Sequence, residues 1–276
     1  VHNHASGLFV LADGMGGHPE GEVAAQMALQ SLSAQYQAQA RPAIGEPGKF
    51  LSEAIHVAHL QLVKYATDKA MLDVPRTTLV AALLQNGQAQ WVHCGDSRLY
   101  VVRNGRLLLR TRDHSFFEHQ EAAGQARSGE PVNRNILFSC LGSPTEPVFD
   151  LSEPLALEHG DRVFLCSDGL WGNLAEKTIT RRLGEDQRPL ADVVTDLVEQ
   201  ALREGGKRCD NVTALAFEWD GADAADTEQA SSGGFASTIQ GVGPPDPWLD
   251  TFDDAAIERS IAEINEAIRR TAAKKV

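Results

Sequence analysis

Two Asn-Gly pairs, Asn86-Gly87 and Asn104-Gly105, constrain the fold of this chain more than any other feature. Each pair joins two short runs rich in apolar residues. Asn-Gly between such runs is a strong signal for a β-hairpin. The middle of the chain is therefore expected to form antiparallel strands. The four runs are Thr77–Leu84, Ala89–Cys94, Arg98–Arg103 and Arg106–Thr111.

Helices and further strands are expected on both sides of this block. Apolar periodicity predicts helices over 20–37, 49–70 and Leu190–Glu204, the last ended by Gly205-Gly206. Another helix is expected to begin near Asn173, with Glu176 placed for a capping box. Residues 116–135 are expected to form a helix and a flexible loop. Strands are expected over 7–12, 136–141, 147–151, Asp161–Ser167 and Val212–Trp219. This order predicts an α+β fold in which helices cover antiparallel sheets.

The composition changes after Trp219, which predicts a division of the chain. We expect one domain over 1–219, a linker rich in small and polar residues over 220–247, and a helical extension over 248–276. The chain begins at Val1, so its N-terminus is expected to be incomplete.

The charge balance argues against two classes of partner. A formal net charge of −13 disfavours nucleic acid and anionic membranes. No apolar run approaches the length of a membrane span. The four cysteines match no zinc pattern, which is typical of reduced thiols. We therefore expect a soluble, cytoplasmic protein.

Three aspartates lie at the boundaries of expected strands. Asp13 and Asp168 each follow an apolar run, and Asp210 precedes the last run. If that last strand is antiparallel to the other two, all three carboxylates meet at one edge. Such a cluster needs a cation to offset the repulsion, and oxygen-only ligands favour Mg²⁺ or Mn²⁺. Gly14 could add its carbonyl oxygen. Any one of these aspartates alone could equally be a turn residue.

Two neighbouring ions in such a site would activate a bridging water and neutralise a phosphate ester. The reaction expected from the residues is an in-line attack of water on phosphorus, without a covalent enzyme intermediate. A serine hydrolase is disfavoured because the chain lacks a G-x-S-x-G elbow.

Six segments together resemble the PPM/PP2C family of metal-dependent Ser/Thr protein phosphatases. The form with Met15 directly after the first Asp-Gly resembles the bacterial branch of this family. The segments are Leu11–His18, Thr77–Val80, Cys94–Arg98, Thr111–Ser115, Cys166–Trp171 and Cys209–Thr213. The resemblance covers residues 7–219. It implies a PP2C-like αββα sandwich, in which two antiparallel β-sheets lie face to face between helix pairs.

The resemblance also implies roles for individual residues. Asp13 would bridge two catalytic ions, Mn²⁺ or Mg²⁺, and Gly14 would bind one through its carbonyl. Asp168 and Asp210 would hold the other ion, and Asp113 would help Asp168 to hold a possible third. Asn211 would orient its neighbour. The implied enzyme acts on phosphoserine and phosphothreonine in the protein substrates of a Ser/Thr kinase. The sequence does not fix the oligomeric state, and a monomer is favoured.

Two family features are absent from the chain, namely an Asn-Glu-Asp-like segment that supplies another acidic metal-site residue and a phosphate-binding arginine. Members carry an arginine upstream of the first Asp-Gly that grips the substrate phosphate, whereas no arginine precedes Arg41 here. Upstream sequence outside the given chain is the favoured explanation. The alternative is a catalytically impaired pseudophosphatase that serves as a regulatory binding module. Met15 cannot donate a proton to the leaving group, so His18 and His114 are the candidate general acids.

Overall fold

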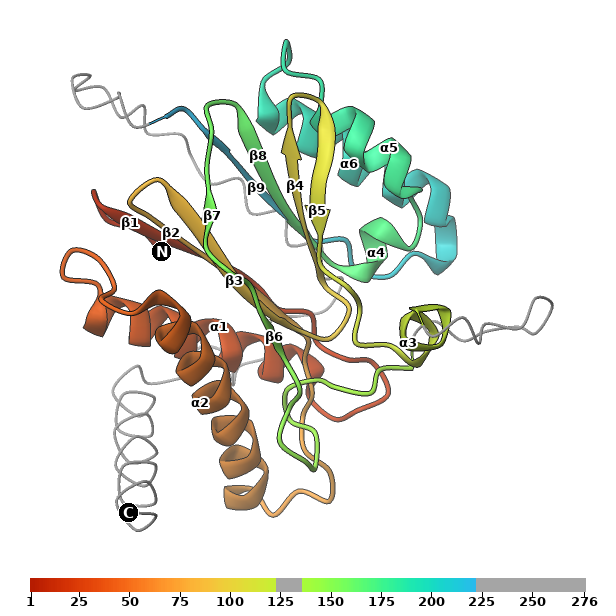
Figure 1. Ribbon diagram of the computed structural model, residues 1–276. Helices are drawn as coiled ribbons and strands as arrows, with labels where there is room; N and C mark the ends of the chain where they lie inside the picture. Colours follow the sequence, from red (N-terminus) through yellow and green to blue (C-terminus); the bar gives the residue numbers. More distant parts are fainter. Residues whose placement is uncertain (123–135, 222–276) are drawn as a thin grey trace.

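Two antiparallel sheets form the centre of the computed structural model, which describes residues 1–122 and 136–221 (Figure 1). The first sheet has the order β1-β2-β3-β6, and β7 also pairs with β3; the second has the order β5-β4-β8-β9. The strands of the first sheet are β1 (Ser6–Leu11), β2 (Leu79–Gln85), β3 (Gln88–Cys94), β6 (Asp150–Leu151) and β7 (Leu155–Ala156). Those of the second are β4 (Arg98–Arg103), β5 (Arg106–Arg110), β8 (Asp161–Cys166) and β9 (Ala214–Trp219).

Helices cover the outer face of each sheet, which confirms the expected αββα sandwich. The first sheet is covered by α1 (Gly21–Gln39) and α2 (Pro47–Asp68). The second is covered by α4 (Asp168–Trp171), α5 (Glu176–Leu183) and α6 (Leu190–Gly205), with a 3₁₀ turn, η1 (Gly206–Arg208), after α6. A short helix, α3 (Phe116–Ala122), follows β5.

Strand β2 shows why the chain forms layers. Its side chains alternate between two apolar surroundings, so nearly every residue of the strand is buried. Leu79, Ala81 and Leu83 pack with the helices, whereas Val80, Ala82 and Leu84 face the second sheet. A strand buried on both faces reads as a continuous apolar run rather than an alternating one.

Both expected hairpins form at the Asn-Gly pairs. Asn86 and Gly87 have φ angles of 52° and 69°, and Asn104 and Gly105 have φ angles of 50° and 71°. Positive φ at both central residues is the geometry of the two-residue turn that matches strand twist. The pairing of β2 with β3 and of β4 with β5 is antiparallel, as predicted.

Three local expectations were wrong. Residues 136–141 form isolated bridges rather than a strand, and of 147–151 only Asp150–Leu151 is a strand. The expected capping box is absent, because α5 begins at Glu176 and has no side-chain cap. Asn173 instead donates its side-chain amide to the carbonyl of Gly169 in α4, at 2.8 Å. The side chain of Asn173 therefore caps the short helix α4, which the apolar periodicity did not predict, and not the start of α5.

The expected linker and C-terminal helical extension lie outside the described residues. Within the described part of the chain, no helix has the length and apolar character needed to cross a membrane.

Candidate metal centre

The three aspartates expected at strand boundaries come together at one end of the sandwich. Asp13 lies two residues after β1, and Asp168 lies two residues after β8. Asp210 precedes β9, which is antiparallel to β8, with Cys166 opposite Ala214. The two segments around Asp168 and Asp210 are in close contact: a Cβ on Gly169 would lie 2.3 Å from the carbonyl oxygen of Asn211. The Asp168 and Asp210 segments therefore meet at the same edge of the second sheet, as the strand directions predicted.

The electrostatics of this cluster call for a cation. The pKa of Asp13 is raised to about 8, first by burial and then by the charge of Asp168, a hydrogen bond to Asp168 and the charge of Asp210. The pKa of Asp168 is also raised, by burial and by Asp210. The raised pKa values of both groups favour a proton held between the two carboxyl groups when no cation is present. The donor set of closely spaced carboxylates thus fits a hard divalent ion, which would take the place of that proton.

The backbone around Asp13 is held by its neighbours in the first sheet. The carbonyl oxygen of Asp13 accepts hydrogen bonds from the Thr78 amide at 2.9 Å and the Thr77 hydroxyl at 2.8 Å. The next residue, Gly14, packs directly against the start of α1, since a Cβ there would lie 2.3 Å from the carbonyl oxygen of Gly21. Only glycine permits this approach. The turn is therefore a rigid platform for the Asp13 carboxylate.

Asp96 is a fourth member of the cluster, and the sequence reasoning missed it. Its pKa is raised to about 7, first by burial and then by the charges of Asp168 and Asp113. Only 6% of Asp96 is exposed. The signal was present in the sequence, because Asp96 lies two residues after the end of β3, as Asp13 does after β1 and Asp168 after β8.

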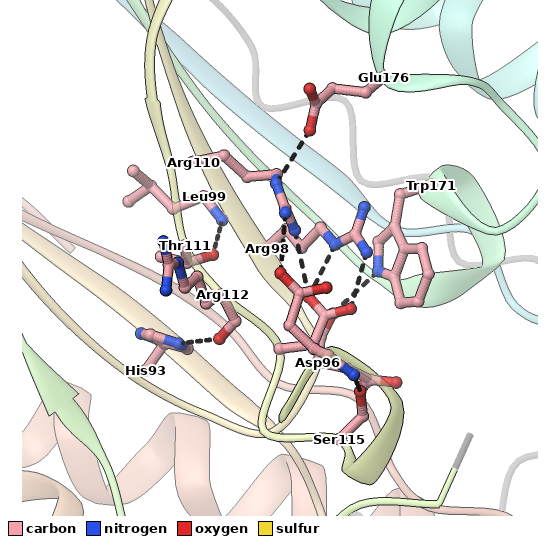
Figure 2. A network of polar contacts seen from close by, with 12 residues as sticks. His93, Asp96, Arg98, Leu99, Arg110, Thr111, Arg112, Ser115, Trp171 and Glu176 are labelled. Carbon is pink, nitrogen blue, oxygen red and sulfur yellow. Dashed lines mark hydrogen bonds and ion pairs between the residues drawn. The ribbon is translucent and has the colours of Figure 1, made fainter. Parts of the chain in front are cut away.

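Asp113 has arginine partners that the sequence analysis did not name. Arg98 binds both of its carboxylate oxygens, through Nε at 2.8 Å and Nη2 at 2.7 Å. A second arginine, Arg110, lies 3.6 Å from Oδ1 and is itself paired with Glu176 at 2.9 Å (Figure 2). Two arginines thus offset the charge of Asp113, whereas Arg98 has only a minor effect on Asp96, whose pKa stays raised. Asp96 is the better placed of the two to share a cation with Asp168.

Asn211 contacts its neighbour through the backbone. Its amide N–H donates to Oδ1 of Asp210 at 2.8 Å, and its carbonyl oxygen accepts from the Ser167 hydroxyl at 3.0 Å. These bonds connect the Asp210 segment to the end of β8. The orienting role expected of Asn211 is therefore supported by its main chain rather than by its side chain.

The two candidate general acids are engaged elsewhere. Nδ1 of His18 lies 2.9 Å from Oδ2 of Asp73. The buried ring of His114 accepts a hydrogen bond from the Gly95 amide at Nδ1, and its Nε2 lies 3.3 Å from Oδ2 of Asp150. These contacts place neither ring nitrogen of His114 on the acid cluster. A general-acid role for either histidine stays a prediction.

His93, His114 and Asp150 form a second group with the composition of a metal site. Nε2 of His93 lies 2.8 Å from the Arg112 carbonyl, so this nitrogen carries the proton. In His114 the Gly95 N–H occupies Nδ1, so the proton of the neutral ring is on Nε2. The nitrogens nearest Asp150 are therefore N–H groups rather than lone pairs. In this arrangement the Asp150 carboxylate faces an N–H group of each ring.

Comparisons with known proteins agree with this architecture. The family model described as Protein phosphatase 2C matches residues 1–207. The serine/threonine phosphatase stp of Listeria welshimeri is 32% identical over 215 residues, covering 76% of this chain and 84% of that protein. The crystal structure of the serine/threonine phosphatase Stp1 from Staphylococcus aureus is 30% identical with a TM-score of 0.70, covering 80% of this chain and 86% of that one.

A third relative concerns the metal. The catalytic domain of the serine/threonine protein phosphatase PstP, solved in complex with two manganese ions, is 31% identical with a TM-score of 0.63. That match covers 78% of this chain and 92% of that one. None of these relatives favours the alternative of a catalytically impaired binding module. The chain belongs to the bacterial branch of the protein phosphatase 2C family and is a metal-dependent serine/threonine protein phosphatase.

Proposed function

We propose that Asp13, Asp96, Asp168 and Asp210 hold the divalent cations of this phosphatase, with Gly14 adding its carbonyl oxygen. The observation that carries the proposal is the convergence of these aspartates at one end of the sandwich, where the Asp168 and Asp210 segments are in direct contact. Burial and the charge of Asp168 raise the pKa of both Asp13 and Asp96, as expected where closely spaced carboxylates lack enough positive charge.

Mn²⁺ is the ion we propose for this site, with two catalytic ions and a third held by Asp96 and Asp168. Oxygen-only ligands suit both Mg²⁺ and Mn²⁺. The PstP domain with two manganese ions supports Mn²⁺. Asp96 replaces Asp113 in this proposal, because Arg98 already binds both oxygens of Asp113.

The residues of the chain have separate tasks in the proposed reaction. When bound, the divalent ions would supply Lewis acidity that activates water and neutralises the substrate phosphate. The Asp13 carboxyl gives up its proton when the site is loaded, so Mn²⁺ binding at neutral pH releases protons to the buffer. The amide of Asn211 holds Asp210 in position, and Thr77 and Thr78 hold the Asp13 backbone.

The proposed substrates are proteins that carry phosphoserine or phosphothreonine placed there by a Ser/Thr kinase. Support comes from the relatives, whose names identify them as serine/threonine phosphatases. A strongly acidic chain disfavours a nucleic acid as the phosphate donor.

Hydrolysis of a phosphothreonine peptide tests the proposal. Turnover should require Mn²⁺, stop on addition of EDTA, and fall by at least about a hundredfold in Asp168→Asn. The exposed residue Asp192 on α6 provides the control, since Asp192→Asn should retain full activity. Turnover that persists in EDTA, or in Asp168→Asn, would contradict the proposal.

A further inference from the structure

Helix α4 connects two of the clustered carboxylates. Its first residue is Asp168 and its last is Trp171, so the two side chains lie one turn apart, on neighbouring positions of the same helix face. The indole Nε1 of Trp171 donates a hydrogen bond to the backbone carbonyl of Asp96 at 2.9 Å. Through Trp171, whose indole lies beside Asp96 and Arg98 in Figure 2, the four-residue helix that begins at Asp168 is therefore connected to Asp96.

The indole of Trp171 also contacts Arg98, the residue at the end of the loop that joins β3 to β4. The guanidinium of Arg98 lies over the Trp171 ring, 3.6 Å from its centroid. Arg98 in turn holds Asp113 through two hydrogen bonds. The ring is thus placed between the acid cluster and a buried ion pair, and it contacts both ends of the segment 96–98.

The remaining residues of the loop after β3 are fixed from other directions. The carbonyl of Gly95 accepts from the His114 amide at 2.9 Å. Ser97 and Thr78 share a hydrogen bond between their hydroxyl groups at 2.7 Å. Gly95 has a φ of 106°, and a Cβ there would lie 2.7 Å from the Cβ of Thr78. The loop has little freedom, and Trp171 is its connection to α4.

We propose that Trp171 is a positioning residue that sets the spacing of Asp96 and Asp168 and thereby the affinity of the most weakly bound divalent ion. This inference rests on the proposed function, in which those two aspartates share a cation. Ligands of a metal ion must be held to within about 0.5 Å by the residues around them. The indole N–H restrains the backbone carbonyl of Asp96 and thereby the position from which its carboxylate reaches towards Asp168.

The substitution Trp171→Phe separates this role from simple packing. It keeps an aromatic ring beneath Arg98 but removes the N–H that bonds to Asp96. Trp219→Phe is the matched control, because Trp219 ends β9 at the edge opposite the acid cluster, paired with Asp161. The thermal midpoint of each variant shows whether the fold is kept.

Calorimetric titration of each metal-free protein with Mn²⁺ tests the inference. In Trp171→Phe the dissociation constant of the weakest ion should rise by about fivefold, the effect of one hydrogen bond, while the tighter ions stay within twofold. Trp219→Phe should match the parent protein. The inference falls if the Trp171→Phe isotherm superimposes on that of the parent, or if every ion is weakened equally. A parent protein that binds no Mn²⁺ would instead refute the proposed function.

Discussion

Removing one charge from the acid cluster should stabilise the metal-free protein. Asp13 has a pKa raised to about 8, because burial and the neighbouring carboxylates disfavour its charged form. The folded protein therefore binds this proton more tightly than the unfolded chain does. The free energy of unfolding then falls as the pH rises from about 4 to about 8.

The size of this loss of stability follows from the change in the pKa of Asp13 on folding. From the ordinary value of 3.8 to about 8, at 1.36 kcal/mol per unit, the cost to the folded state reaches up to about 5 kcal/mol at pH 8. Asp13→Asn removes the charge but keeps the shape and can still donate a hydrogen bond to Asp168. We expect this variant to gain about 2–5 kcal/mol at pH 8 in EDTA, and about a third of that gain at pH 5.

Urea unfolding at the two pH values, followed by tryptophan fluorescence, measures this difference. Asp192→Asn on the exposed face of α6 should show no gain at either pH. The reasoning is refuted if Asp13→Asn is no more stable than the parent at pH 8, or if its gain is the same at pH 5. In Mn²⁺ the order should reverse, because the parent gains from ion binding and the variant has lost a ligand.

Three further predictions concern ions, packing and proton transfer. Mn²⁺ at about a hundred times its dissociation constant should stabilise the fold by about 2.7 kcal/mol, seen as a higher thermal midpoint that EDTA reverses; an unchanged midpoint would contradict ion binding. Gly169→Ala should cost at least about 1–3 kcal/mol in urea unfolding, because its Cβ would lie 2.3 Å from the Asn211 carbonyl; unchanged stability would show that the two segments separate freely. His114→Gln should keep kcat within about tenfold, since both ring nitrogens have other neighbours, whereas loss of a general acid costs about 10²–10⁴-fold.

The sequence was sufficient for the layers and for most of the acid cluster. Asn-Gly turns and apolar periods depend on local backbone preferences, so the hairpins and the long helices could be predicted. The convergence of Asp13, Asp168 and Asp210 followed from strand direction alone. It needed only the antiparallel pairing of β8 with β9, which the structure confirms.

The sequence pattern did not show which side chains become partners in the folded protein. Arg98 begins β4 and Asp113 follows β5, so the hairpin closed at Asn104-Gly105 brings them together across 15 residues. Asp96 was overlooked although it obeys the same strand-end rule as Asp13. Its part in the cluster depends on burial and on its distance from Asp168, which are tertiary properties.

Anomalous diffraction from crystals grown in Mn²⁺ locates each ion of the metal centre without reference to activity. We expect two strong peaks among Asp13, Asp168 and Asp210, and a weaker one between Asp96 and Asp168. Peaks on Asp113 in place of Asp96 would contradict the assignment of the third ion. Crystals without any manganese at the four aspartates would contradict the metal centre itself.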